Sequence, residues 1–277
     1  MKALNDSGAK VWRFFGIPRS GNHAIIEWVM KNIDDGTLVF LNNCGRGSPS
    51  EAFSYTNFDR GNGVEKHRGN IYREKNRHYT RLAEAIEHAE NIVVSYEIFP
   101  VDTASTQALW QDSKMTSDEV QDTFIIRSPL NLLASCLKRI ENETTHKNRI
   151  AVKTRNFLAD QFSQYSGYLK RYEDDPESCV IYDLWGADEK YRAEKLRHLG
   201  IDAVNTDLGQ MTSAGGGSSF DRGQEISTIS TSKRWIGLET NEFFNEAVND
   251  MVTDQSLMQS IHTVFPKDHA QLVELGS

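Results

Sequence analysis

Residues 11–32 read VWRFFGIPRSGNHAIIEWVMKN and contain three successive patterns. The apolar run Val11–Phe15, broken only by Arg13, predicts a buried strand, and the apolar-rich residues at the end of the stretch predict a helix. The loop between them is bounded by Gly16 and Gly21. Such a loop can hold a phosphate, because successive N–H groups point into one concavity at the positive end of the helix dipole.

The residues that end this loop differ from those of a nucleoside triphosphate-binding loop. That loop needs Lys followed by Ser or Thr, to reach the phosphates and to hold magnesium. Asn22 and His23 occupy those positions, and Arg19 is the cation within the loop. The stretch therefore predicts a phosphate site without the magnesium clamp of phosphoryl transfer. The alternative is an ordinary strand-to-helix turn with a coincidental glycine spacing.

The composition is that of a globular protein that folds in water. The chain has 277 residues, 38% hydrophobic and 25% charged, which fits one large α/β domain. No apolar run approaches the roughly 18 residues of a membrane span, and the N-terminal MKALNDSGAK lacks the apolar core of a secretory signal. The net charge of −8 disfavours general nucleic-acid binding.

The cysteines favour a reducing compartment. No CxxC or Cys/His metal spacing occurs among the three of them, Cys44, Cys136 and Cys179. Their odd number and spacing argue against a disulfide framework and against a zinc site. We therefore expect a cytoplasmic protein.

Further strands are expected in four stretches, residues 37–41, 91–97, 122–127 and 178–182. Helices are expected over residues 79–89, 129–140, 150–172, 188–199, 241–251 and 254–264. This alternation predicts an α/β fold in three layers, with a central, mostly parallel sheet and helices on both faces, like that of the P-loop kinases. Ligands bind outside the carboxyl ends of such strands, so Glu97 and Arg127 stand where chemistry is expected.

Arg127 and Ser135 form the most specific pattern in the chain. Arg127 closes a strand, Ser128 and Pro129 are suited to begin a helix, and Ser135 lies eight positions after Arg127. An Arg at a strand end and a hydroxyl on the next helix can grip a phosphate together. Ser135 falls on the polar face of that helix, so we expect its hydroxyl to be free for a ligand. The alternative pairs Arg127 with a carboxylate and leaves Ser135 solvated.

These patterns resemble the sulfotransferases that use 3′-phosphoadenosine 5′-phosphosulfate (PAPS). Pro18–Gly21 resembles the family's 5′-phosphosulfate loop, with Asn22 and His23 in place of two threonines. Arg127 and Ser135 resemble its 3′-phosphate motif, including the spacing. The resemblance implies a P-loop-like sulfotransferase fold and transfer of a sulfuryl group from PAPS to a hydroxyl or amine, with no metal required.

The resemblance also implies roles for individual residues. Glu97, at a strand end where the family carries its general base, would take the acceptor's proton, and Arg19 would stabilise the leaving phosphate. If Glu97 instead pairs with a nearby Arg or caps the turn, His23 or His67 is the fallback base. Tyr182 would lie near the nucleotide or, alternatively, belong to the core. The implied nucleotide-binding residues are Pro18, Arg19, Ser20, Gly21, Asn22, His23, Ala24, Arg127, Ser135, Tyr182, Lys233 and Arg234.

Two long polar stretches complete the single expected domain, 1–277. Residues 42–81 are polar and rich in glycine and basic residues, which favours a lid or acceptor-binding loop, or else a solvated surface excursion. Residues 206–235 are rich in Gly and Ser and end on Lys233 and Arg234, as expected of a loop that covers the nucleotide. We expect a small-molecule or glycan acceptor.

The sequence leaves two other functions open. A divergent P-loop nucleotide kinase would need magnesium and a carboxylate after a later strand, for which Asp183 is the candidate. A catalytically inactive nucleotide-binding module would bind nucleotide without turnover. The replacement of both loop threonines, by Asn22 and His23, keeps that interpretation open.

Overall fold

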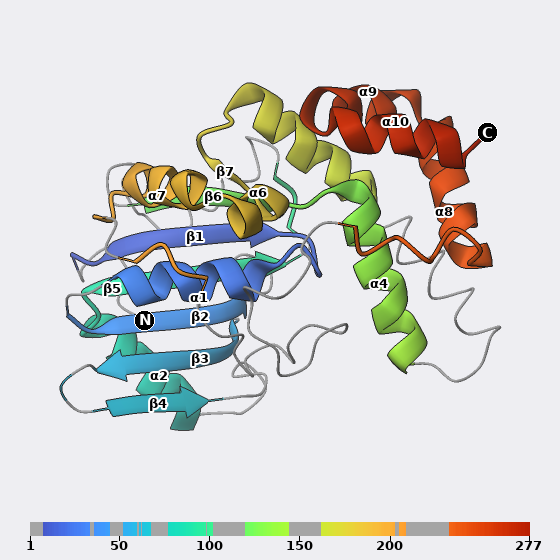
Figure 1. The fold of residues 1–277 in the computed structure, drawn as a ribbon. Helices are drawn as coiled ribbons and strands as arrows, with labels where there is room; N and C mark the ends of the chain where they lie inside the picture. The colour runs from blue at the N-terminus through green and yellow to red at the C-terminus, as the bar shows by residue number, and fades with distance from the viewer. Residues whose placement is uncertain are drawn as a thin grey trace.

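A computed structural model of the chain describes residues 8–33, 36–44, 52–59, 61, 63–67, 77–97, 99–101, 120–143, 162–202, 205–208 and 233–277. The strands are β1 (Lys10–Gly16), β2 (Leu38–Cys44), β3 (Ala52–Asp59), β4 (Gly63–His67), β5 (Asn91–Glu97), β6 (Val120–Ile126) and β7 (Cys179–Ile181). They form one sheet of seven strands in the order β4-β3-β2-β5-β1-β6-β7 (Figure 1).

The sheet is mostly parallel, as predicted. β2, β5, β1, β6 and β7 run parallel to one another, while β3 and β4 add an antiparallel edge next to β2. From β1 the chain moves to one side for β2 and β5 and to the other side for β6 and β7. The carboxyl end of β1 therefore lies where the strand order switches, which is the usual ligand position in open α/β sheets.

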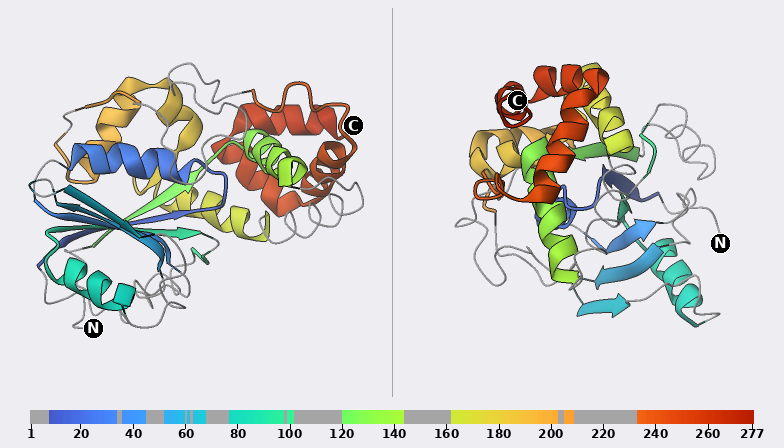
Figure 2. Two further views of the ribbon diagram at one scale, coloured as in Figure 1. Left: turned by 90° about the horizontal axis from the view of Figure 1, so that it is seen from below. Right: turned by 90° about the vertical axis from the view of Figure 1, so that its right-hand side faces the viewer.

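Helices cover both faces of the sheet. They are α1 (Asn22–Asn32), α2 (Arg77–Glu87), α4 (Pro129–Glu143), a helix of residues 162–174, α6 (Tyr182–Ala187), α7 (Glu189–His198), α8 (Glu242–Thr253), α9 (Gln255–Val264) and α10 (Pro266–Leu275). Figure 2 shows α1, α6 and α7 on one face and α2 and the 162–174 helix on the other. The predicted α/β fold with helices on both faces is therefore confirmed.

A group of C-terminal helices lies beyond the carboxyl edge of the parallel strands. β1 points toward α4, and α8, α9 and α10 gather beside α4 (Figures 1 and 2). The last of them, α10, begins at Pro266 and is a helix that the apolar spacing of the sequence did not predict. Within the described part of the chain, no helix has the length and hydrophobicity needed to cross a bilayer.

The predicted loop over residues 42–81 is in fact partly ordered into strands. β2 continues to Cys44, β3 and β4 form a hairpin, and α2 begins at Arg77. In the hairpin Ala52 and Tyr55 are buried, most of the other positions are polar, and Phe53 and Val64 are exposed. That mixture hides the strands in the sequence. The rest of the stretch lies outside the described residues, and so do residues 209–232 of the expected covering loop.

Alternation along β1 supplies both halves of the core. Val11 and Phe15 point into one buried cluster and Trp12 and Phe14 into the other, because successive strand residues face opposite sides of a sheet. The same alternation places Arg13 on the face of Val11 and Phe15. The three cysteines are free thiols within these buried layers.

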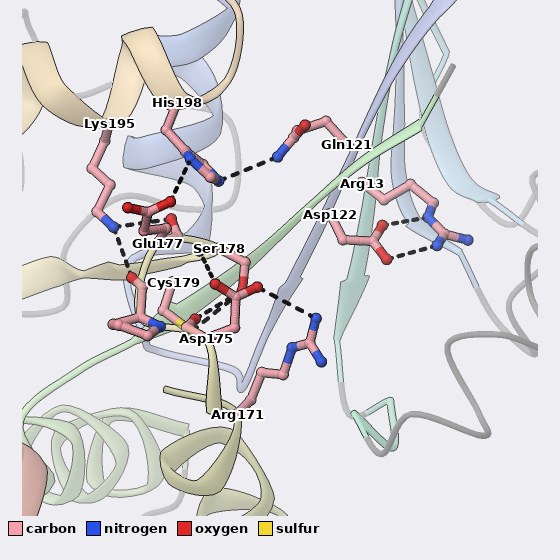
Figure 3. A network of polar contacts seen from close by, with 11 residues as sticks. Arg13, Gln121, Asp122, Arg171, Asp175, Glu177, Ser178, Cys179, Lys195 and His198 are labelled. Carbon is pink, nitrogen blue, oxygen red and sulfur yellow. Dashed lines mark hydrogen bonds and ion pairs between the residues drawn. The ribbon is translucent and has the colours of Figure 1, made fainter. Parts of the chain in front are cut away.

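Arg13 is accommodated by a carboxylate on the neighbouring strand. It lies opposite Asp122 in the β1–β6 register, donating from Nε to Oδ1 at 2.6 Å and from Nη2 to Oδ2 at 2.8 Å (Figure 3). Both side chains are largely enclosed, at 4% and 13% exposure. This fork explains how a charged residue can interrupt the apolar strand that the sequence predicts.

Removing one partner of this buried pair should strongly destabilise the fold. We expect Arg13→Ala to lower the free energy of unfolding by about 3–5 kcal/mol, because Asp122 is left as a buried charge. Arg81→Ala is a matched control, since it breaks an equally short pair with Glu65 that is exposed, and should cost at most about 1 kcal/mol. Urea denaturation measures both; equal losses would contradict the assignment.

A second polar network closes the other end of β7. Lys195 of α7 donates to the carbonyls of Pro176 and Glu177, and His198 lies between Glu177 and Gln121 of β6 (Figure 3). These contacts tie α7 to the amino ends of β6 and β7. They stand at the opposite edge of the sheet from the loop after β1.

Candidate active site

Strand register brings the predicted site residues to one edge of the sheet. Gly16, the last residue of β1, lies opposite Glu97 on β5 and Ile125 on β6. Ile126 and Ile181 are opposite each other at the ends of β6 and β7. Because parallel strands end at a common edge, the loop after Gly16 begins between the strand that carries Glu97 and the strand that leads into Arg127.

The loop between β1 and α1 is a tight turn built on left-handed backbone. Ser20 N donates to Ile17 O at 3.0 Å, and Arg19 and Gly21 have φ values of 77° and 96°. A non-glycine residue at positive φ is uncommon, and such conformations gather at ligand-binding sites. Pro18 and Ser20 are buried within the turn.

Tyr182 packs directly on the second glycine of the loop. A Cβ added to Gly21 would lie 2.1 Å from the Tyr182 ring, so only glycine fits there. The other contacts of that ring are a stack on Trp185 at 5.5 Å and the Arg127 guanidinium at 4.9 Å from its centroid. The sequence allowed Tyr182 either to lie near the nucleotide or to belong to the core. In the structure its ring is buried and packs against the loop.

The side chain of Asn22 braces the loop. Its Nδ2 donates to Gly16 O at 3.2 Å and Ile17 O at 3.3 Å, and the residue is buried. The first N–H groups that bond back at the start of α1 belong to Ala24 and Ile25, both to Gly21 O. The N–H groups of Asn22 and His23 precede them, at the end of the helix where N–H groups have no intrahelical acceptor. The helix start can therefore receive an anion through its backbone.

Arg127 is a buried cation with unused donors. It is 2% exposed, and its Nη1 donates to the carbonyl of Arg19 at 2.9 Å. Its Nε and Nη2 are also buried and have no hydrogen-bond partner among the described residues. Buried polar groups are nearly always paired, so two unpaired donor nitrogens on one guanidinium require an explanation. An oxyanion held by both nitrogens would supply it.

Ser135, which the sequence places on the polar face of its helix, is buried rather than exposed to solvent. It is 1% exposed and accepts a hydrogen bond from Arg19 Nε at 3.3 Å. The polar face of α4 is turned toward the loop after β1 rather than toward solvent, which brings the two motifs into contact across 116 positions of the chain.

Positive charge gathers where these motifs meet. Burial raises the pKa of the Cys136 thiol to about 12, and the guanidinium groups of Arg19, Arg127 and Arg139 oppose that shift. All three guanidinium groups therefore act electrostatically on the middle of α4. Like charges in proximity favour an anionic partner.

Glu97 and His23 face each other beside the loop. His23 Nε2 lies 4.0 Å from Glu97 Oε1, and the two side chains are 29% and 24% exposed. Burial lowers the pKa of His23, while the Glu97 and Glu27 carboxylates oppose that shift. The imidazole is therefore neutral at neutral pH. His67 ends β4, and its side chain lies outside the described part of the structure.

Two aspartates meet at the first turn of α4. Asp183 accepts from Ser128 N at 2.7 Å and from Asn131 Nδ2 at 2.9 Å, and Ser128 Oγ donates to Asp268 of α10. Burial raises the pKa of Asp183, against the nearby Arg127 charge. Since both carboxylate oxygens of Asp183 accept hydrogen bonds from α4, this residue does not present the open carboxylate that the kinase alternative needs.

Protonation of Asp268 should make stability depend on pH. Burial raises the pKa of Asp268 above its ordinary 3.8, so the folded state holds this proton more tightly than the unfolded state. The stability that protonated Asp268 contributes is therefore greatest below pH 3.8, and it is lost as the pH rises through the pKa that this residue has in the folded state. We expect the stability of Asp268→Asn, followed by urea denaturation across this range, to fall less with rising pH than that of wild type. Parallel curves would contradict this.

The basic pair after the Gly/Ser-rich stretch approaches the same helix. Arg234 N donates to Asn131 Oδ1 at 2.8 Å, and Trp235 packs against the core. Lys233 is exposed and has a φ of 72°. The predicted covering segment thus ends beside the first turns of α4.

These elements define a P-loop-like α/β protein: a glycine loop after the first strand, a helix aimed at it, and a parallel sheet. No protein-family model and no curated protein matches the chain. Among solved structures, the chain is similar to mouse sulfotransferase SULT7A1 complexed with PAP, at a TM-score of 0.53 and 13% identity. The match covers 99% of this chain and 93% of that one. This likeness shows the fold.

Sequence reasoning missed two residues at this edge, Asn131 and Asp268. Asn131 lies one helical turn before Ser135, on the same polar face of the helix, and that spacing could have drawn attention to it. Asp268 is 140 positions from its partner Ser128, and no local pattern reveals such a contact.

Proposed function

We propose that the protein is a PAPS-dependent sulfotransferase, which transfers a sulfuryl group to a hydroxyl or amine of a small-molecule or glycan acceptor. Arg127 carries the proposal: its buried Nε and Nη2 have no acceptor among the described residues. It stands beside a loop and a helix start suited to a second phosphate. Two anion sites side by side fit a nucleotide phosphorylated at both 3′ and 5′ positions.

Each part of the loop has a task in this proposal. The backbone N–H groups of Asn22 and His23, with Gly21 before them, would hold the 5′-phosphosulfate. Arg19 would neutralise the charge that develops on the phosphate oxygen as the bond to sulfur breaks. The side chain of Asn22 holds the loop in shape rather than contacting the ligand, because its Nδ2 donates to two loop carbonyls.

The 3′-phosphate would lie on Arg127, with Ser135 as the neighbouring hydroxyl. Ser135 accepts from Arg19, so its own O–H remains as a donor, and Lys233 and Arg234 would close over the phosphate. Recognition of this group is what would distinguish PAPS from ATP.

Proton removal falls to Glu97. As the acceptor oxygen or nitrogen bonds to sulfur, its proton would pass to the Glu97 carboxylate, and the departing nucleotide would keep the electron pair of the broken S–O bond. The neutral His23 beside Glu97 would orient the carboxylate or receive the proton from it. We also propose a cytoplasmic location, in keeping with three free cysteines.

A transfer assay tests the proposal. Purified protein would be incubated with ³⁵S-labelled PAPS, a panel of phenols, sugars and amines, and EDTA to remove divalent metal. We expect labelled product, with release of 3′-phosphoadenosine 5′-phosphate, for at least one acceptor class. Nucleotide binding without transfer to any class would favour an inactive nucleotide-binding module instead.

A further inference from the structure

The Asn131 side chain joins three different segments of the chain. Its Nδ2 donates to Ser128 Oγ at 3.2 Å and to Asp183 Oδ1 at 2.9 Å, and its Oδ1 accepts from Arg234 N at 2.8 Å. A backbone N–H can only donate, so the amide oxygen must face Arg234 and the amide nitrogen must face Asp183. The side chain is 3% exposed. Its orientation is therefore fixed.

The place of Asn131 links it to the proposed 3′-phosphate site. It lies one turn before Ser135, on the same side of α4. Its partner Asp183 interacts electrostatically with Arg127. The carboxamide thus contacts the segment that begins at Lys233, and it lies one helical turn from Ser135, one of the two residues proposed to bind the phosphate.

Two local turns and a contact with the core also shape the segment. Ile236 N bonds to Lys233 O and Leu238 N to Trp235 O, which closes two local turns, and Trp235 packs on the core. Lys233 has a left-handed backbone, a conformation that a non-glycine residue keeps only when its surroundings hold it. The hydrogen bond from Arg234 N to Asn131 Oδ1 ties the backbone between Lys233 and Trp235 to α4.

We propose that Asn131 is a positioning residue, which fixes the Lys233–Trp235 segment so that its basic side chains reach the 3′-phosphate. This rests on the proposed function. Asn131 would not contact the nucleotide. Its loss should weaken recognition of the 3′-phosphate and leave binding of the 5′-phosphate unchanged.

Calorimetric titration of Asn131→Ala with 3′-phosphoadenosine 5′-phosphate and with AMP separates these effects. We expect the affinity for the bisphosphate to fall about tenfold, as for one lost charge-assisted contact, and the affinity for AMP to change by less than about twofold. Asn131→Ser introduces a side chain too short to reach Arg234 and Asp183 together, so its affinities for the two nucleotides should change as in Asn131→Ala. It is the second variant if the alanine protein does not fold.

Asn32→Ala is the matched control. Asn32 is equally buried at 3%, lies at the end of α1, donates to Trp28 O and accepts from Asn205 N at 2.8 Å. It therefore repeats the link between a helix asparagine and a distant backbone N–H, away from the site. We expect a comparable loss of stability with no change in nucleotide affinity.

A double-mutant cycle shows whether Asn131 acts through the segment. In a protein that already carries Lys233→Ala and Arg234→Ala, Asn131→Ala should have no further effect on bisphosphate affinity. Wild-type affinity in the single Asn131 variants, or equal losses for AMP and the bisphosphate, would overturn the proposal while the function stands. If wild type binds no bisphosphate, the function fails and this inference with it.

Discussion

Arg127→Ala should bind 3′-phosphoadenosine 5′-phosphate about a hundredfold more weakly than wild type. The side chain offers two buried donor nitrogens without a partner among the described residues, and each charge-assisted hydrogen bond contributes roughly 1.5 kcal/mol or more. Two such bonds amount to about 3 kcal/mol, or about two powers of ten in Kd. The affinity for AMP, which lacks the 3′-phosphate, should change little. Calorimetric titration with both nucleotides measures the difference.

Arg192→Ala controls for the loss of a buried arginine. Arg192 is 8% exposed, so it is also buried. Its guanidinium donates to the carbonyls of Thr206 and Trp185, so these hydrogen bonds stabilise the fold. We expect its nucleotide affinities to stay at the wild-type level. Arg127→Lys should be intermediate, because it keeps the charge and loses the two-pronged geometry. Unchanged bisphosphate binding in Arg127→Ala would remove the 3′-phosphate assignment.

Glu97→Gln should lower turnover by about 10²- to 10⁴-fold, the usual contribution of a general base. The amide keeps the shape of the carboxylate and cannot take a proton. Glu97 lies at the carboxyl end of β5, beside the loop, so binding of the product nucleotide should be preserved. The measurement is the rate of transfer from PAPS to whichever acceptor the assay identifies, together with the nucleotide Kd.

Two further variants divide the role between Glu97 and His23. Glu90→Gln removes a carboxylate just before the other end of β5 and should leave the rate unchanged. His23→Gln should cost less than Glu97→Gln if the imidazole assists the carboxylate. A larger loss in His23→Gln would make the histidine the base, and full activity in Glu97→Gln would exclude Glu97 from proton transfer.

Local patterns predicted most of the elements that form the site. β5 spans Asn91–Glu97, as expected, because a mostly apolar run, interrupted only by Ser95, ends there on a charge. The Ser128–Pro129 pair places the start of α4 at the predicted residue, because Pro is tolerated in the first turn and rarely later. The mostly parallel sheet agrees with the alternation of strands and helices along the chain.

Contacts between distant segments could not be predicted in the same way. Ser135 was expected to be free because periodicity tells which face of a helix is polar, but not what packs on that face. Arg19 covers it. Similarly, the β3–β4 hairpin has few buried residues, and its polar positions resemble a loop. The hydrogen bonds of Asn131 join α4 to Asp183 and Arg234, which lie far along the chain.

The two residues after Gly21 differ from the sulfotransferase pattern that the loop resembles. Where the sulfotransferase pattern has two threonines, this chain has Asn22 and His23. Asn22 turns its side chain inward onto the loop carbonyls, and His23 turns toward Glu97. In the proposed function, a loop brace and a partner for the proposed base would stand where the pattern has hydroxyl contacts, and the backbone N–H groups at the helix start would still hold the phosphate.

Calorimetric titration of the wild-type protein with 3′-phosphoadenosine 5′-phosphate, and separately with ADP and magnesium, decides between a PAPS site and a kinase site. We predict tight binding of the bisphosphate that is the same with and without EDTA, and weak binding of magnesium-ADP. Preferential, metal-dependent binding of ADP would contradict the proposed function and support a nucleotide kinase on the same fold.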